Sequence, residues 1–394
     1  MQIYVYGIKI KIIFVEILSI MHKVVVASDS FKGCLSSWQV ADAVEKGIHD
    51  AMPGCDVVKL AVADGGEGSM DALMTTLGGK PVRLMVSDPL GRPVEAEYAW
   101  IDGSTAVIEM ARASGLTLLV SEERDPLLTY TYGTGQLIAD ALDKGCRRFL
   151  ICIGGSATND AGTGMLEALG YRFMDSGGNI LKGCGEALGR ISSIDVSNVH
   201  PALSESEFIV ACDVDSPFCG PDGAAYVYGP QKGASPEMVE QLDRGMRHFA
   251  RIIFQVTGVD VTDMPGAGAA GGLGGALKAF LKAEISRGAD MVLDAVHFDD
   301  AIKDADLVIT GEGRIDSQTL TGKLPYVVAK RAAAQNIPVV ALCGCAQVSE
   351  LPCFERIIQI TPPDMPLEKA MSPEVSSSAI CKLAKLALDV FDSL

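Results

Sequence analysis

The chain has 394 residues, of which 48% are apolar and 21% charged, and its formal net charge is −17 at pH 7. This length fits two domains better than one, and the apolar share is large enough for buried cores, which excludes a disordered protein. The acidic balance argues against a nucleic-acid or membrane partner. Eleven cysteines without a CxxC pair, several of them inside apolar runs, indicate a cytoplasmic protein rather than a disulfide framework.

The first twenty residues are apolar, but Lys9, Lys11 and Glu16 interrupt them. A membrane span needs about 20 mostly uncharged residues, and a signal peptide carries its cations before the apolar stretch. We interpret residues 1–20 as a non-native N-terminal extension, with Met21 as the working start. A membrane anchor is the alternative interpretation.

Beyond Met21, short β-branched runs alternate with longer helical stretches, which is typical of parallel sheets joined by crossover helices. The pattern predicts strands at 24–27, 57–63, 105–110, 149–153, 208–212, 307–310, 339–343 and 357–360. It predicts helices at 36–51, 68–77, 132–144, 237–257, 276–285, 322–335 and 376–391. Residues 82–100 alternate apolar and polar residues around a Pro-Leu-Gly turn, which predicts an antiparallel hairpin.

The parallel type of strand occurs at both ends of the chain, and the hairpin lies between them. This order predicts an α/β protein with a discontinuous outer domain, residues 21–80 plus 290–394. A second, mixed α/β domain, residues 81–289, is inserted into it.

Acidic residues and glycines follow the predicted strands again and again. Because ligands of open α/β sheets bind outside the carboxyl ends of the strands, we expect these residues to share one crevice, although each alone is an ordinary turn residue. The charged and polar residues of these loops are Asp29, Ser30, Lys32, Asp64, Glu67, Glu109, Asn159, Asp160, Asp213, Asp215, Glu312 and Asp316.

Three glycine-rich loops differ in how strongly they indicate a phosphate or nucleotide site. ICIGGSATNDAGTG, residues 151–164, places glycines between a strand and a helix, an arrangement that binds phosphate through backbone N–H groups. GAGAAG, residues 266–271, matches a dinucleotide fingerprint but does not follow a strand, so close helix packing or a mobile loop beside the nucleotide explains it better. GPQKGA, residues 229–234, carries Lys232, and a lysine in a polar loop is usually solvated.

DSFKG, ADGGEG and GEGRIDSQTLTGK combine carboxylates, cations, glycines and hydroxyls. Phosphoryl transfer needs this mixture, because carboxylates hold Mg²⁺ or accept a proton and cations neutralise the developing charge. Lys32, Arg314 and Lys323 are the best-placed cations, with surface ion pairs as the ordinary alternative. Arg112 fits a carboxylate clamp and an exposed helix start equally well.

Nine segments together resemble the bacterial glycerate kinase family, class I, of the glycerate 2-kinase type. They are DSFKGCLSS, VADGGEG, VIEMARASGL, YGTGQLI, IGGSATNDAGTGM, ACDVDSPFCGPDGA, GPQKGA, PGAGAAGGLG and ITGEGRIDSQTLTGK. The resemblance runs from Met21 to about Cys345. It implies a flavodoxin-like domain, a second domain similar to a restriction-enzyme fold, and an active site in the cleft between them. It also implies transfer of the γ-phosphoryl group of ATP to D-glycerate, giving 2-phosphoglycerate, with Mg²⁺ as the metal. Whether the chain forms a homodimer stays open.

The candidate residues fall into four groups, within which sequence does not separate the general base from the metal ligands. The catalytic candidates are Asp64, Asp316, Lys32 and Arg314. The nucleotide-binding candidates are Gly154, Gly155, Ser156, Thr158, Asn159, Asp160, Gly268 and Gly271. The metal candidates are Asp213 and Glu67, and the substrate-binding candidates are Asp29, Ser30, Glu312 and Lys323.

Two other classes of function stay open at this point. The GAGAAG string leaves room for a nicotinamide-dependent oxidoreductase of small hydroxy acids. A non-catalytic sensor that binds an organic acid on the same scaffold is the second alternative.

Overall fold

The computed structural model describes residues 22–393, so the predicted N-terminal extension lies outside the described residues. By contacts the chain divides into two compact units, and each is described by itself. Unit 1 comprises the residues up to Asp64 and those from Val292 onward, and unit 2 is Gly65–Met291. The helix α10 (Gly288–Ala295) crosses the second boundary.

Unit 1 is built on a sheet of five parallel strands in the order β14-β13-β12-β1-β2. The strands are β1 (Lys23–Ser28), β2 (Asp56–Ala61), β12 (Leu307–Ile315), β13 (Val339–Ala346) and β14 (Arg356–Gln359). The helices are α2 (Ser37–Ala51), α11 (Phe298–Ala301), α12 (Leu324–Ala333), α13 (Leu367–Ala370) and α14 (Pro373–Ala384), with 3-10 turns at Ser317–Thr321 and Lys385–Ser393. The chain leaves β1 toward β2 on one side and returns through β12 on the other, so β1 and β12 flank a topological switch point.

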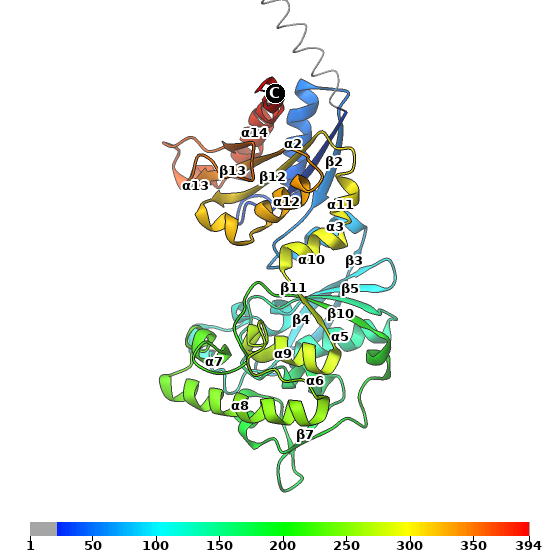
Figure 1. The fold of residues 1–394 in the computed structure, drawn as a ribbon. Helices are drawn as coiled ribbons and strands as arrows, with labels where there is room; N and C mark the ends of the chain where they lie inside the picture. The colour runs from blue at the N-terminus through cyan, green and yellow to red at the C-terminus, as the bar shows by residue number, and fades with distance from the viewer. Residues whose placement is uncertain (1–21, 394) are drawn as a thin grey trace, which may run out of the picture. The chain divides into compact units, whose positions relative to one another are not determined.

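The helices of unit 1 cover both faces of this sheet (Figure 1). α2 and α14 pack together on one face, over a core that includes Val24, Val26 and Ile309, and α12 lies on the other. Gly47 permits the close approach of α2 to α14, because a Cβ there would lie 2.2 Å from the backbone oxygen of Cys381. Ser36 begins α2 with a capping box, in which its hydroxyl accepts from the N–H of Gln39.

Unit 2 contains a six-stranded mixed sheet in the order β11-β10-β6-β5-β4-β3. Its strands are β3 (Lys80–Ser87), β4 (Pro93–Ile101), β5 (Thr105–Glu109), β6 (Arg148–Cys152), β10 (Glu207–Ala211) and β11 (Glu284–Ser286). The predicted hairpin is confirmed, since β3 and β4 pair antiparallel. A small sheet of β7 (Arg172–Met174), β8 (Ile180–Leu181) and β9 (Ser193–Asp195) was not predicted, because these strands are too short to show a period.

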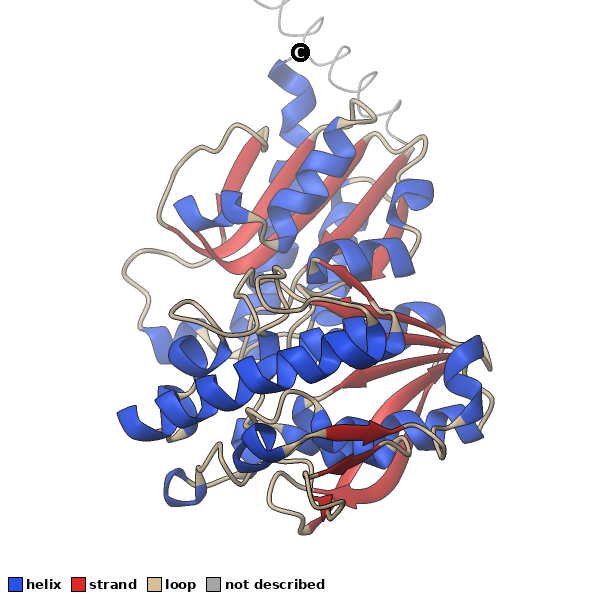
Figure 2. Ribbon diagram, turned by 60° about the horizontal axis from the view of Figure 1, so that its bottom comes forward, coloured by secondary structure: helices blue, strands red, loops and turns tan. Residues whose placement is uncertain are grey.

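Apart from α3, the helices named next contribute with this sheet to one large apolar core, and the long α8 stands out in Figure 2. They are α3 (Ser69–Leu77), α4 (Ala111–Ser114), α5 (Tyr132–Asp143), α6 (Thr163–Ala168), α7 (Ala224–Tyr228), α8 (Pro236–Thr257) and α9 (Ala269–Leu281). Sequence analysis assigned α3 to the outer domain, but it packs on β4 and β5 and so belongs to unit 2. No helix in residues 22–393 is long and apolar enough to span a bilayer.

Candidate active site

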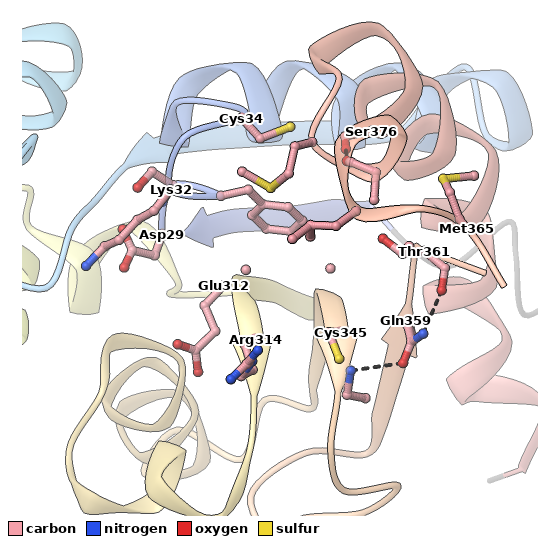
Figure 3. A pocket seen from close by; sticks show the side chains of 18 of the residues that line it. Asp29, Lys32, Cys34, Glu312, Arg314, Cys345, Gln359, Thr361, Met365 and Ser376 are labelled. Atoms are coloured by element: carbon pink, nitrogen blue, oxygen red, sulfur yellow. Dashed lines mark hydrogen bonds between the residues drawn. The ribbon is translucent and has the colours of Figure 1, made fainter. Parts of the chain in front are cut away.

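The carboxyl ends of the strands in unit 1 open into a cavity of about 920 Å³. The last residues of β12, β13 and β14 and the loop after β1 line it, so it lies at the switch point of the sheet. Figure 3 shows Asp29, Lys32, Glu312 and Arg314 gathered on one side of this cavity. Gln359, Thr361 and Met365 lie on the other side.

The backbone holds Asp29 firmly at this edge. Its N–H donates to the carbonyl oxygen of Gly311 in the middle of β12, over 2.9 Å. Its own carboxylate accepts from the N–H of Ser30 over 2.7 Å. Gly311 must be glycine, because a Cβ there would lie 2.2 Å from the carbonyl oxygen of Leu342. The switch point thus depends on a close approach of three neighbouring strands.

The charge around Asp29 is mixed. Only 6% of Asp29 is exposed, and burial, followed by repulsion from Asp64, raises its pKa to about 7. Lys32 forms an ion pair with Asp64 over 3.1 Å. Burial also raises the pKa of Glu312 above its ordinary value. Carboxyl groups with raised pKa values in a cavity are typical of sites that move protons.

Glu312 belongs to a second group of side chains, in the last part of β12 and the turn that follows it. It accepts from the hydroxyl of Thr319 over 2.9 Å, and Lys323 lies 3.4 Å from its other oxygen. Asp316 begins the turn Ser317–Thr321 as its cap and lies 3.5 Å from Lys323. Arg314 is exposed and lines the cavity, whereas Asp316 caps a turn beside it.

The predicted phosphate loop lies in unit 2, and much of it is buried. Asp160 is fully buried and accepts from the N–H and hydroxyl of Thr131 and from the N–H groups of Gly162 and Gly164. Met165 donates its N–H to the hydroxyl of Thr131. The first amides of α6, a helix of six residues, are therefore already bonded within the protein. Burial raises the pKa of Asp160, although these donors oppose the change.

The outer part of the same loop is open. Gly154 and Gly155 are exposed, and Ser156 is half-buried, so these three residues remain accessible to a ligand. Thr158 and Asn159 are buried, and their side-chain oxygens have no hydrogen-bond partner within residues 22–393.

Gly268 and Gly271 serve packing around this loop. A Cβ at Gly268 would lie 2.1 Å from the carbonyl oxygen of Pro217, and one at Gly271 would lie 2.1 Å from that of Thr158. Gly271 also has a positive φ of 70°, inside the kinked start of α9. The GAGAAG string therefore fits close backbone packing, in a context without the strand that a dinucleotide site requires.

Lys232 is a residue that sequence analysis undervalued. Its side chain is buried, and Nζ donates to the hydroxyl of Ser156 over 2.8 Å and to the carbonyl oxygen of Thr158 over 2.7 Å. Burial lowers the pKa of Lys232 to about 7, with Asp160 acting in the opposite direction. Glycines on both sides of the short GPQKGA loop were the available signal, because they let the chain turn closely under its neighbours.

The remaining candidates of unit 2 are acidic. Asp213 and Glu67 are both exposed, and Asp213 accepts from the N–H of Gly288 over 3.0 Å. Arg112, left open by the sequence, pairs with Glu109, Glu97 and Asp71, which favours a structural ion network over a substrate clamp.

The parallel sheet, its switch point and the charged cavity define the class of protein: an α/β enzyme that handles a small charged molecule at the carboxyl edge of its sheet. A sequence model of the Glycerate kinase family matches residues 24–391, and the chain belongs to this family.

Curated relatives support the same conclusion. Glycerate kinase of Bacillus subtilis is 47% identical over 88% of this chain and 92% of the relative, and glycerate 2-kinase of Escherichia coli is 47% identical over 82% and 85%. A crystal structure described as glycerate kinase 2 from Salmonella typhimurium LT2 covers 95% of this chain and 99% of its own. It has a TM-score of 0.88 and 43% identity.

Proposed function

We propose that the protein is an ATP-dependent glycerate kinase that transfers the γ-phosphoryl group of ATP to the C2 hydroxyl of D-glycerate. The observation that carries this proposal is the charged cavity at the β1–β12 switch point, in a chain that belongs to the glycerate kinase family over nearly its whole length. The name of the Escherichia coli relative favours 2-phosphoglycerate as the product. We place the activity in the cytoplasm, a choice supported by eleven cysteines that are all free thiols.

Asp29 is the proposed general base. A base works best when its pKa lies near the operating pH, and burial brings the pKa of Asp29 to about 7. The substrate oxygen forms a bond to the γ-phosphorus, the bond from that phosphorus to the leaving ADP oxygen breaks, and the hydroxyl proton passes to Asp29. Ser30, next to it, is the proposed contact of the glycerate hydroxyl groups.

The cations of the cavity have proposed roles in binding and charge neutralisation. Arg314 is exposed and lines the cavity, and its fork geometry suits the carboxylate of glycerate. Lys32 and Lys323 balance the charge of the transferred phosphoryl group, and Glu312 and Asp316 position Lys323.

Asp64 holds Lys32 through the ion pair and remains a catalytic candidate together with Asp316. Asp64→Asn and Asp316→Asn should each depress turnover while leaving the fold intact. Unchanged turnover in both variants would remove both residues from the mechanism.

We propose Asp213 and Glu67 as carboxylates for Mg²⁺, which in such reactions neutralises charge on the phosphate oxygens. Mg²⁺ usually takes only one or two carboxylates beside phosphate and water, so two exposed acids suit it. Their segments meet in unit 2, because a Cβ at Gly65 would lie 2.3 Å from the Cα of Gly288, whose N–H binds Asp213. Within the described part of the chain, no group of three or more His, Cys, Asp or Glu residues forms a metal cage.

Gly154, Gly155 and Ser156 remain the proposed phosphate contacts of the glycine-rich loop, since they are the accessible part of it. Thr158, Asn159 and Asp160, with Gly268 and Gly271 behind them, hold the loop in shape.

The test is a coupled assay of ADP release with a panel of short hydroxy acids, followed by phosphorus NMR of the product. We expect release that depends on D-glycerate and a phosphate ester at C2. ADP release that ignores glycerate would contradict the proposal, and binding of glycerate without release would favour the sensor. A rise in melting temperature with NADH but not with ATP would favour the oxidoreductase.

A further inference from the structure

The cavity of unit 1 is larger and less polar than glycerate requires. At about 920 Å³ it lies near the upper end of the range, about 300–1,000 Å³, that is usual for drug-sized ligands. Glycerate is a three-carbon acid whose carboxylate and hydroxyl groups leave it no apolar face. The charged side around Asp29 and Arg314 is enough for such a molecule, so glycerate does not account for the rest of the cavity.

The rest of the cavity is mainly apolar and comes from two segments. One is the turn after β1, and the other is the chain between β14 and α14. The side chains that form this apolar end are Phe31, Cys34, Met365, Leu367, Ala370 and Met371. Figure 3 shows Met365 beside Thr361, on the side of the cavity away from Glu312 and Arg314, and Cys34 across the cavity from Arg314.

The turn after β1 is rigid. The N–H of Phe31 donates to the carbonyl oxygen of Leu35 over 2.9 Å, and Leu35 donates back over 3.0 Å. Gly33 takes a positive φ of 74° inside this turn, and a Cβ there would lie 3.2 Å from the end of the Met371 side chain. Phe31 is held in place by backbone bonds, and thioethers such as that of Met371 adapt to the faces of flat rings.

A fixed polar group interrupts the apolar end. The side-chain oxygen of Gln359 accepts from the N–H of Ala346 over 2.9 Å, and its nitrogen donates to the carbonyl oxygen of Thr361 over 2.6 Å. Its amide therefore has one orientation, and its second N–H has no hydrogen-bond partner among residues 22–393. An apolar wall with one oriented polar group is the usual environment of a heteroaromatic ring.

We infer that the apolar end of this cavity binds the purine base of the nucleotide, with the phosphates directed toward Lys32 and Lys323. This inference rests on the proposed kinase function and goes beyond it by assigning the base to unit 1. A nucleotide is the one substrate of the reaction that has both a flat apolar ring and a strongly anionic end, and the cavity has a matching apolar end and cations. The carboxyl edge at a switch point is also where open α/β sheets bind nucleotides.

The experiment uses Ala370→Trp, which fills the apolar end, and Lys369→Trp as a matched control, because Lys369 is exposed and does not line the cavity. Adenosine, which lacks phosphates, and D-glycerate are titrated separately by calorimetry against the full-length chain. We expect Ala370→Trp to weaken adenosine binding at least about tenfold with glycerate affinity unchanged, and Lys369→Trp to behave as the wild type.

Unchanged adenosine affinity in Ala370→Trp would overturn the inference, and so would a loss of glycerate affinity in its place. If Ala370→Trp does not fold, Met371→Asp places a charge at the same end from an exposed position, and the same outcomes decide. The inference and the proposed function fail separately. A wild type that binds adenosine at this end but never phosphorylates glycerate contradicts only the function, and a wild type that turns over glycerate while Ala370→Trp binds adenosine normally contradicts only the inference.

Discussion

The loop after β1 in unit 1 and the loop after β6 in unit 2 look alike in sequence, since each places glycine, serine and aspartate between a strand and a helix. In the structure they differ. Asp29 faces a cavity and has a carboxylate neighbour, Asp64, that opposes its ionisation. Asp160 is enclosed and accepts hydrogen bonds from Thr131, Gly162 and Gly164. A carboxyl group that lines a cavity and has a raised pKa can exchange protons with a ligand, whereas one enclosed by hydrogen-bond donors stabilises the fold.

The largest expected effect is on the unit 1 side of this comparison. Asp29→Asn should lower kcat about 10²–10⁴-fold, because the amide cannot accept the hydroxyl proton. The Asp29→Asn variant should keep the fold. The pKa of Asp29 is raised in the folded state, so its ionisation costs stability as pH rises from about 4 through about 7, and asparagine avoids that cost. Above that range Asp29→Asn should be about 0.5–2 kcal/mol more stable than the wild type.

Steady-state kinetics and urea unfolding measure both effects for Asp29→Asn. Asp42→Asn is the control, because Asp42 is an exposed acid of α2 in the same unit that pairs with Lys59 on the surface. Turnover near that of the control would remove Asp29 from catalysis.

The next largest effect is expected on the stability of unit 2. Asp160→Asn places an NH₂ group where the carboxylate accepts N–H donors, so the free energy of unfolding should fall by about 3 kcal/mol. Urea unfolding beside Asp222→Asn, an exposed acid of the same unit, provides the comparison. Equal stability of the two variants would show that the buried network around Asp160 does not stabilise unit 2.

The contribution of Lys232 to stability should depend on pH. Its pKa is lowered to about 7 in the folded state, so between about pH 7 and 10 the unfolded chain binds more protons. The free energy of unfolding should therefore rise across that window by up to about 1.4 kcal/mol per pH unit through the contribution of Lys232. Below the window this contribution should be constant. Lys232→Met should lack this slope. Parallel slopes in the variant and the wild type would mean that Lys232 is charged and solvated.

The smallest effect on stability is expected at Asp316, which caps a turn in unit 1. Asp316→Ala should lower the free energy of unfolding by about 1 kcal/mol, and Asp316→Asn by only a few tenths, because asparagine also caps well. Thermal unfolding of the two variants, measured side by side with the wild type, checks this difference in stability. A larger loss in Asp316→Asn than in Asp316→Ala would contradict the capping role.

Much of the fold could be predicted, because strand periods and glycine turns are local. The strands β1, β6 and β12 and the hairpin β3–β4 follow directly from the pattern of apolar residues. The charged side of the cavity could also be predicted, since Asp29 directly follows one parallel strand, Glu312 lies near the end of its neighbour, and the carboxyl ends of the two must meet.

Three features could not be predicted from sequence. Lys232 looked like a solvated loop lysine, because nothing local reports the depth at which a loop lies. Asp160 looked like part of a phosphate loop, because its partner Thr131 is far away in the chain. The apolar end of the cavity was missed, since Phe31 and Met371 are far apart in sequence and each alone resembles an ordinary core residue.

The pH dependence of kcat/KM for D-glycerate tests the central claim most directly, because it reports the ionisation of the free enzyme. We expect a rate that rises to a plateau through an apparent pKa near 7, the value to which burial raises the pKa of Asp29, and no such rise in Asp29→Asn. A wild-type profile that is flat from about pH 5.5 to about pH 8.5, or a rise that persists in the variant, would contradict it.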